Sequence, residues 1–451
     1  MKKRYRVIIV GSGPSGIFAA LALAKGGVED MAIFERGKDI HDRTRDRGME
    51  LLCGWGGAGA FSDGKLTLSP RVGGFLGDFI PQNELMNLIR KADETYRFFG
   101  APKVVHGQSS DETEALYQEA KLAGLEYIPM EIRHLGTENC SPLLQRVRKD
   151  LGEKVDVFFE TPVKELLVEK GRATGVLLHN GTPVEASFVI CGPGRVGAEW
   201  IKSEMERLGI SSVPSPVDIG VRVEAPVPIL RKLTDLTYEA KFIYYSKTFD
   251  DRVRTFCMNP FGEVVTEPIE DIVTVNGHSY AQRKTENTNF AILVSNTFTE
   301  PFRDPIGYGK YIARLANLLG NGVIVQRLGD LLDGRRSTRG RIHRCITQPT
   351  LISATPGDLS FVLPYRHLKS IIEMLEALDR ITPGIFSRHT LLYGVEVKFY
   401  TNRAKISSVL ETDIQNLFLI GDGAGITRGL MQASISGMLA ANEILKRIRK
   451  E

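Results

Sequence analysis

The first apolar run of the chain is short and ends at glycine. Residues 7–10 are four apolar, β-branched side chains, followed by the turn Gly-Ser-Gly-Pro-Ser-Gly at 11–16 and an Ala/Leu-rich stretch at 17–24. This pattern predicts a buried parallel strand, a tight turn and a helix. A second apolar run at 31–34 ends at Glu35. Together these features are typical of a dinucleotide-binding βαβ unit.

The three glycines of this turn have separate roles in the predicted unit. Gly11 allows the sharp turn off the strand, Gly13 lets the backbone approach a pyrophosphate, and Gly16 removes a side chain that would hold the helix away from the strand. The helix N-terminus then faces the anion. Glu35 can accept hydrogen bonds from both ribose hydroxyls of an adenosine. Glycine turns without a ligand do occur, but here the strand, the helix and the acid all agree with a nucleotide site.

A second glycine-rich stretch lies between Cys53 and Leu66, with five glycines in the eleven residues 54–64. Such a stretch does not favour a helix or a strand, so we expect its backbone to wrap against a flat or phosphorylated group. The alternative is a flexible loop, but two aromatic residues interleave the glycines where a linker would be polar. The charged segment before it, 38–47, predicts a solvated helix.

The remaining periodicity divides into helical, antiparallel and nucleotide-site segments. Apolar spacing predicts helices over 83–99 and 111–123, and a helix from Pro142 after the cap-like Asn139 and Ser141. Alternation and turn residues predict a small antiparallel meander, short strands further on, and a closing strand, turn and helix. The expected ranges are 155–159, 163–169, 175–178 and 184–190 for the meander, 241–245 and 290–294 for the short strands, and 416–420, 421–425 and 430–448 for the end.

Composition narrows the class of protein further. The 451 residues are enough for two or three domains, and a net charge of +4 is too small to indicate nucleic acid. The five cysteines are scattered without a CxxC pair, which argues against a disulfide framework and an iron–sulfur cluster. His343 and Cys345 have no further metal ligands nearby in sequence, so no metal is expected. No apolar run approaches the ~20 residues of a membrane span, and we expect a cytoplasmic protein.

The order of these motifs resembles that of FAD-dependent oxidoreductases with the glutathione-reductase-like flavoprotein fold. The resemblance covers 4–74, 155–197 and 391–441. More narrowly, the stretches 55–66, 394–399 and 421–433 are similar to a bacterial family known only as FAD-dependent dehydrogenases.

This resemblance implies an α/β fold with a Rossmann-like FAD-binding domain, built from a parallel sheet plus a small antiparallel meander, and an inserted α+β substrate domain. The expected FAD-binding parts are 1–75, 135–205 and 391–451. A mainly helical excursion is expected at 76–134, and the substrate or cap domain at 206–390.

The resemblance also implies cofactor contacts. The first glycine turn would meet the FAD pyrophosphate, Glu35 the adenosine ribose, and Arg36 and the Val163 backbone the adenine. Asp422 would bind ribityl or pyrophosphate-side hydroxyls, and the amides at 429–431 would face the flavin pyrimidine. The expected cofactor-binding residues are Gly11, Gly13, Ser15, Gly16, Glu35, Arg36, Gly57, Ala58, Ser62, Val163, Gly192, Gly421, Asp422, Gly429, Leu430 and Met431.

A second GxGxxG at 192–197 could be taken for a separate NAD(P) site. No second strand ending in an acid follows it, and the next residues, 213–217, are proline-rich. We interpret 192–197 as a turn that returns the chain beside the first motif. NAD(P)H would then bind only transiently, near the flavin.

Catalytic and substrate residues are less well defined by the sequence. Lys65, Glu396 and Lys398 are the polar residues we expect nearest the flavin, with plain salt bridges as the alternative for each. Five arginines fall within 335–344, and Arg336 and Arg339 are candidates to clamp a carboxylate or phosphate. A solvated loop is an equal alternative.

The expected activity is hydride transfer between flavin N5 and a small organic substrate, which would be anionic if the arginines bind it. One alternative is a flavin monooxygenase. Another is a flavoprotein that modifies or binds RNA through the arginine run, but the charge balance and the lack of interleaved aromatics argue against it. The substrate and the oligomeric state stay undefined at this level.

Overall fold

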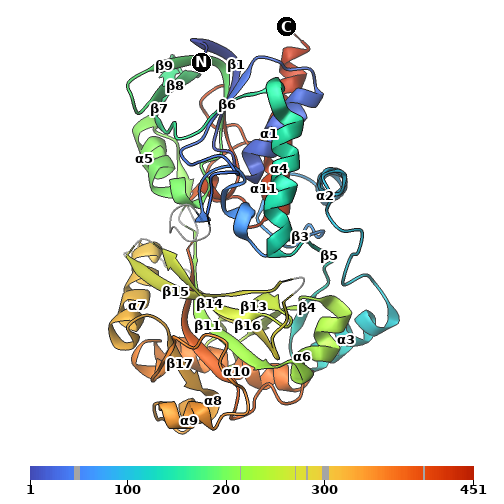
Figure 1. Cartoon of the computed structure of the whole chain (residues 1–451), viewed down its shortest axis with the longest axis vertical. Coiled ribbons are helices and arrows are strands. Elements are labelled where there is room, and N and C mark those ends of the chain that lie inside the picture. The colour runs from blue at the N-terminus through green and yellow to red at the C-terminus, as the bar shows by residue number, and fades with distance from the viewer. Residues whose placement is uncertain are drawn as a thin grey trace. The chain divides into compact units, whose positions relative to one another are not determined.

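The computed structural model describes residues 1–44, 51–213, 215–269, 271–280, 283–296, 304–399 and 402–450. The chain divides into two compact units (Figure 1). The first unit combines Met1–Val104, Arg133–Ser215 and Tyr400–Glu451, and the second combines Val105–Ile132 and Pro216–Phe399.

These limits differ from the expected ones at two places. Val105–Ile132 lies with the second unit, although 76–134 was expected as one helical excursion. The strand Leu391–Lys398 also lies in the second unit, whereas the C-terminal FAD-binding part was expected to start at 391. The reason is hydrogen bonding, because this strand is paired along both edges within the second unit's sheet.

The first unit is built on a seven-stranded sheet in the order β6-β2-β1-β9-β8-β7, with β21 also paired to β9. The strands β6, β2, β1, β9 and β21 are parallel, and β7 and β8 form an antiparallel meander with β9. A parallel sheet plus a small meander therefore agrees with the expected Rossmann-like architecture. The strands are β1 (Arg4–Val10), β2 (Met31–Phe34), β6 (Asp156–Phe158), β7 (Val163–Glu169), β8 (Arg172–Leu178), β9 (Pro183–Cys191) and β21 (Leu417–Leu419).

Helices cover this sheet, and two of them come from opposite ends of the chain. Figure 1 shows α1 and α11 side by side. A side chain on Gly437 of α11 would come within 1.9 Å of the Ser15 carbonyl oxygen of α1, so the two helices approach as closely as glycine allows. The helices and short strands of this unit are α1 (Pro14–Lys25), α2 (Gln82–Phe98), α4 (Thr137–Leu151), α5 (Ala198–Leu208), α11 (Leu430–Ile448), β3 (Lys65–Thr67), β5 (Ile132–His134), β10 (Ser212–Val213) and β20 (Arg403–Ala404).

The second unit is built on an eight-stranded sheet in the order β18-β17-β19-β11-β16-β13-β12-β4, with a separate hairpin β14–β15. Its strands are β4 (Glu126–Ile128), β11 (Val217–Pro226), β12 (Lys241–Tyr245), β13 (Arg252–Asn259), β14 (Glu263–Ile269), β15 (Ile272–His278), β16 (Asn287–Asn296), β17 (Ile324–Arg327), β18 (Thr355–Pro356) and β19 (Leu391–Lys398). Its helices are α3 (Asp111–Leu122), α6 (Val227–Thr237), α7 (Pro305–Gly320), α8 (Leu328–Leu332), α9 (Arg339–His343) and α10 (Tyr365–Asp379).

The two faces of this second sheet differ in chemistry. In β11, Val221 and Val223 belong to the apolar core shared with α6, α7 and α10. Because side chains alternate along a strand, the intervening Asp218, Arg222 and Glu224 lie on the opposite face, where all three are at most 1% exposed. The sheet therefore buries charge on one face and apolar surface on the other.

Two expected helices are corrected by the structure. Residues 38–44 form turns and irregular structure in place of the expected solvated helix, whose remaining residues 45–47 lie outside the described part. The helix expected from Pro142 begins at Thr137 instead and contains that proline. Asn139 does not cap it, because its side-chain amide donates to the Leu135 carbonyl at 2.8 Å. Among the described residues, no helix has the length and apolar character needed to cross a membrane.

Candidate cofactor-binding site

In the turn after β1, close packing of the backbone requires glycine at positions 11 and 16. Gly11 has φ +94°, and a Cβ there would lie 2.4 Å from the Gly192 carbonyl oxygen. A Cβ on Gly16 would lie 2.0 Å from the Gly11 carbonyl oxygen. Any side chain at either position would therefore push the turn away from β9 or from α1.

Gly13 is different, because the protein itself leaves room beside it. No atom of the described residues lies within 4 Å of a Cβ built on Gly13, whose φ of −70° is open to any residue. Gly13 caps α1, which has no acidic residue in its first turn. The helix N-terminus therefore presents backbone N–H groups and positive partial charge to open space. A pyrophosphate is the kind of group that such a cradle fits.

The glycine-rich stretch comes next to this cradle. A Cβ on Gly57 would lie 3.1 Å from the Gly13 Cα atom. Gly57 and Ala58 begin a 3₁₀ helix, Gly57–Phe61, and both are partly exposed. Ser62 follows, and its hydroxyl donates to the Gly59 carbonyl at 3.0 Å and accepts from the Gly64 amide at 3.2 Å. The Ser62 hydroxyl thus serves this turn.

The Glu35 carboxylate is hydrogen-bonded to the backbone of the cradle. Oε2 accepts hydrogen bonds from the amide and the hydroxyl of Ser12, both at 2.8 Å. Oε1 accepts from the Gly37 amide at 2.8 Å and the Gly54 amide at 3.0 Å. Four donors thus occupy a carboxylate that is 5% exposed, which is about its full acceptor capacity. The ribose contact stays a prediction, and it would have to share or replace one of these bonds.

Two more glycine turns meet the first at the carboxyl edge of the sheet. A Cβ on Gly192 or Gly421 would lie 2.9 or 2.7 Å from the Ser15 hydroxyl oxygen. The Gly192 amide donates to the Val10 carbonyl at 2.8 Å. The interpretation of 192–197 as a turn returning beside the first motif is therefore confirmed.

Asp422 sits in the last of these turns, with its side chain about a quarter exposed. The Thr427 hydroxyl donates to Oδ1 at 2.6 Å, and Arg195 lies 3.9 Å from Oδ2. Burial raises the pKa of the Asp422 carboxyl, against the opposing charges of Arg195 and Arg428. The carboxylate can still accept hydrogen bonds from ligand hydroxyls.

The N-terminus of α11 provides a second set of backbone amides. Gly429 caps the helix, and its first turn contains no acidic residue. The Leu430 side chain points into the protein, because a Cβ on Gly59 would lie 2.9 Å from its Cδ2 atom. Gln432, which sequence reasoning missed, donates to the Val72 carbonyl at 2.9 Å and accepts from the Leu76 amide at 3.3 Å. Gln432 thereby ties the segment after the glycine-rich stretch to α11.

The other expected contacts are placed as follows. Met431 is buried in the first turn of α11, Val163 is buried at the start of β7, and Arg36 is exposed after Glu35. Lys65 lies in the first unit and pairs with Asp63 at 3.2 Å.

Glu396 and Lys398 lie together in the second unit. Glu396 is 0% exposed and lies 3.0 Å from Nε of Arg222 and 3.2 Å from Nζ of Lys398. Lys398 also contacts Glu267 at 3.1 Å. Burial opposes the charged ammonium, but Glu267 and Glu396 outweigh it and raise the pKa of Lys398. The ion pairs that were the alternative to catalysis are thus present for Lys65, Glu396 and Lys398.

Arg336 and Arg339 line a cavity of about 670 Å³ in the second unit, which neither Glu396 nor Lys398 lines. In the described part of the chain, no group of three or more His, Cys, Asp or Glu residues could hold a metal ion. The five cysteines all lie within the described residues and form no disulfide there.

Residues 216–399 match the family described as FAD-dependent protein, C-terminal domain-like. The matched segment is most of the second unit, and the glycine cradle lies in the first unit. The class of protein that this match indicates is an FAD-dependent protein, and the cradle has the form that a dinucleotide would need.

Among individual proteins, an uncharacterized protein of Clostridium beijerinckii is 26% identical, over 98% of this chain and 81% of its own length. The chain is also similar to solved structures. Glycine oxidase from Geobacillus kaustophilus aligns with a TM-score of 0.40 and 14% identity over 99% of this chain and 95% of that chain. L-amino acid deaminase from Proteus myxofaciens aligns with a TM-score of 0.42 and 12% sequence identity, over 99% of this chain and 91% of that chain.

Proposed function

We propose that the first unit binds FAD across the carboxyl edge of its parallel sheet, as in flavoproteins of the glutathione-reductase-like fold. The observation that carries the proposal is the open cradle at Gly13. The fold requires Gly11 and Gly16, whereas nothing in the described protein occupies the space that a side chain on Gly13 would fill. A residue left bare without a packing reason is what close approach of a phosphate demands.

Within this proposal, the polar groups at the carboxyl edge of the first sheet contact different parts of FAD. The α1 amides and the Ser15 hydroxyl bind the pyrophosphate, with Gly57 alongside. Asp422 accepts hydrogen bonds from ribityl or pyrophosphate-side hydroxyls, and the amides opening α11 face the flavin pyrimidine. When bound, FAD supplies two-electron chemistry at N5. The positive end of α11 stabilises negative charge on the reduced ring system.

The finer part of the proposal concerns the partners of the flavin. We propose hydride exchange with a small organic substrate held by the second unit, with NAD(P)H as a transient partner. Glu396 is the candidate for a chemical role, because it is a fully buried carboxylate whose contacts with Arg222 and Lys398 are ion pairs without well-aligned hydrogen bonds. Buried carboxylates are normally satisfied, and an exception is typical of functional sites.

The cofactor test is direct. Purified protein is expected to be yellow and to release FAD, not FMN, on denaturation, as read by chromatography of the supernatant. Colourless protein that takes up no FAD on reconstitution would overturn the proposal.

The electron-partner test uses the same preparation. Stopped-flow reduction by NADH and by NADPH, each with and without oxygen, is expected to show reduction that does not require oxygen. Reduction that proceeds only with a substrate, followed by reoxidation in which oxygen is consumed and one of its atoms is transferred to that substrate, would favour the monooxygenase alternative instead.

A further inference from the structure

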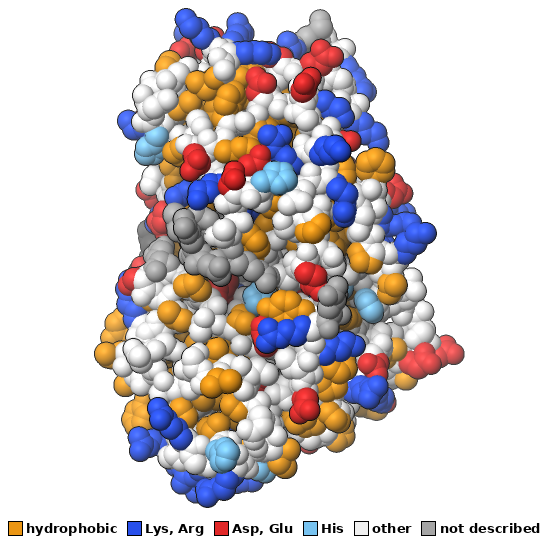
Figure 2. All heavy atoms as spheres, viewed as in Figure 1, with side chains coloured by type: hydrophobic (Ala, Val, Ile, Leu, Met, Phe, Trp, Pro, Cys, Tyr) orange, Lys and Arg blue, Asp and Glu red, His pale blue; other side chains and the backbone are white. Residues whose placement is uncertain are grey.

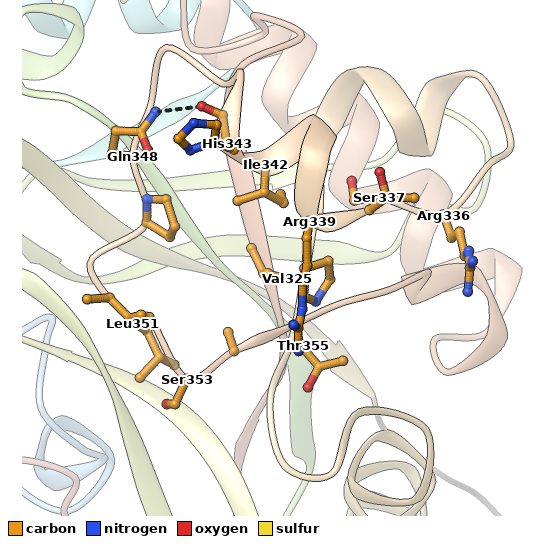
Figure 3. A pocket seen from close by; sticks show the side chains of 15 residues that line it. Val325, Arg336, Ser337, Arg339, Ile342, His343, Gln348, Leu351, Ser353 and Thr355 are labelled. Carbon is orange, nitrogen blue, oxygen red and sulfur yellow. Dashed lines mark hydrogen bonds between the residues drawn. The ribbon is translucent and has the colours of Figure 1, made fainter.

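A cavity of about 670 Å³ opens in the second unit between α9, the strand β17 and the segment leading to β18. Figure 3 shows Ile342, Val325 and Leu351 around it, and Arg339 extending along one side toward Thr355. Arg336 lies farther out, with its guanidinium turned away from Leu351. We call this cavity the arginine pocket. Its volume falls within the ~300–1,000 Å³ of small-molecule sites.

The arginines of the 335–344 cluster fall into two groups. Arg335 pairs with Asp330 at 3.0 Å and Asp333 at 2.9 Å, and Arg341 lies 3.9 Å from Asp330. Within the ranges that the structure describes, the guanidinium groups of Arg336 and Arg339 have no carboxylate or hydrogen-bond partner. The nearby acids are thus committed to other arginines, and the two without partners are those that line the pocket.

No acidic residue lines the arginine pocket among the described residues. In Figure 2, Lys and Arg side chains gather at the lower end of the view, where Figure 1 places α8 and α9. The positive charge of Arg336 and Arg339 is therefore not neutralised by an acidic residue lining the pocket. Their planar guanidinium groups can bind an anion through bidentate hydrogen bonds.

The opposite wall of the pocket is anchored to the sheet by buried groups. The Thr350 hydroxyl donates to Glu224 at 2.6 Å, and the Asn287 amide donates to the Gln348 carbonyl at 2.7 Å. Tyr393 donates to the same Glu224 at 2.5 Å. Because Glu224 and Tyr393 are 0% exposed, this wall is fixed before any ligand arrives, which reduces the ordering entropy of binding.

The arginine pocket lies apart from the Glu396–Lys398 cluster within the second unit. Val325, which lines the pocket, pairs with Tyr393 in the sheet. Lys398 is five residues further along the same strand, or about 16 Å at ~3.3 Å per residue. Two separate groups of charged residues thus occupy one sheet.

We propose that the arginine pocket binds an organic anion, with a carboxylate or phosphate group on Arg339 and an apolar body against Ile342 and Leu351. Arg339 makes the main contact and Arg336 adds attraction from the rim. Binding requires neither FAD nor turnover, because every group involved belongs to the second unit. The site therefore stands independently of the proposed flavin chemistry.

The test is calorimetric titration of the full-length protein, as purified, with phenyl phosphate, benzoate and inorganic phosphate. Phenyl phosphate and benzoate are expected to bind, inorganic phosphate more weakly for lack of an apolar body, and the stronger of the first two identifies the anion class. Arg339→Ala is expected to raise the Kd about tenfold and Arg336→Ala by less, since a charged hydrogen bond is lost in the first case. Arg344→Ala is the matched control, because Arg344 is exposed in the same cluster but does not line the pocket.

Three results would overturn the inference. The first is that no probe gives binding heat at millimolar concentration. The second is that Arg344→Ala raises the Kd as much as Arg339→Ala does, and the third is that inorganic phosphate binds as tightly as phenyl phosphate. Melting temperatures show whether Arg339→Ala still folds, and Arg339→Lys, which keeps the charge without the planar fork, should restore part of the affinity. Yellow protein that binds no anion would refute this site alone, whereas colourless protein that binds phenyl phosphate would refute the flavin proposal alone.

Discussion

The amide and the hydroxyl of Ser12 both lie 2.8 Å from the same carboxylate oxygen of Glu35. Ser12 lies between Gly11 and Gly13 in the sequence, so its two hydrogen bonds to Glu35 fix the backbone of the cradle. The second carboxylate oxygen holds Gly37 and Gly54 in the same way. Glu35 therefore organises three separate segments whether or not a nucleotide contacts it.

Glu35→Gln is expected to weaken both folding and FAD binding. The amide has one acceptor oxygen and presents N–H groups where two donors now point, so buried donors lose their partners. We expect a loss of about 3 kcal/mol in unfolding free energy and about 1–3 kcal/mol in FAD affinity. Urea titration of the apoprotein and fluorescence titration with FAD measure the two effects. Glu29→Gln, at an exposed position, should change neither. A variant with wild-type stability would show that the four hydrogen bonds are not formed in solution.

Gly13→Ala separates cofactor binding from folding. A methyl group at Gly13 meets nothing within 4 Å in the described part of the chain, whereas one at Gly16 would lie 2.0 Å from a backbone oxygen. Gly13→Ala should therefore fold with a melting temperature near that of the wild type and bind FAD at least about tenfold more weakly. Gly16→Ala should fail to fold stably. Gly340→Ala serves as the control, since its Cβ also meets nothing within 4 Å. Full FAD content in Gly13→Ala would contradict the cradle.

Glu396→Gln tests whether the buried pair with Arg222 is structural or chemical. Both side chains are 0% exposed, so removing one charge leaves the other without compensation, at a cost of about 3–5 kcal/mol. The double variant Arg222→Met with Glu396→Leu should recover part of that stability, because Lys398 loses Glu396 but keeps Glu267 as a partner. If Glu396 has a chemical role, this stable double variant turns over substrate far more slowly than the wild type. Wild-type turnover by the double variant would remove Glu396 from the candidate catalytic residues.

Lys241 should make stability rise with pH in alkaline solution. Burial, aided by the charge of Arg254, lowers the pKa of this lysine from 10.5 to about 7. Between those values the unfolded chain holds a proton that the folded protein lacks, so the free energy of unfolding increases with pH by up to about 1.4 kcal/mol per pH unit. Lys241→Met should abolish this slope, and the exposed Lys247→Met should keep it. Urea titrations from pH 7 to 10 measure it. Parallel curves for wild type and Lys241→Met would show that Lys241 keeps its ordinary pKa.

The architecture of the first unit could be predicted because its signals are local. The buried strand at 7–10 and the helix at 430–448 have unbroken apolar or amphipathic patterns bounded by glycine, and the structure has them at those places. The assembly of the second sheet could not be predicted in this way. The strand β4 has three residues and pairs with β12 from more than a hundred residues away, and no local pattern encodes such a pairing.

Prediction of the site was limited by side-chain geometry. The cradle was identifiable because Gly11 and Gly16 leave no room for a side chain and Gly13 completes the spacing of the motif. The position of Glu35 was also evident, but its partners Ser12 and Gly54 depend on where the carboxylate points. Gln432 belongs to no motif. Whether Arg339 is free or paired depends on where Asp330 lies, which sequence spacing does not reveal.

The contact between Gly437 and Ser15 has a consequence for the order in which the protein is made. The second sheet is complete once β19 has been synthesised, but the first sheet still awaits β21, and α1 still awaits α11. During translation the second unit can thus fold while the N-terminal βαβ segment stays incomplete, with residues 189–191 of β9 unpaired on one edge and apolar surface uncovered. Such nascent chains favour chaperone binding and aggregation. Truncation before residue 417 would leave the first unit in that state and the second unit folded.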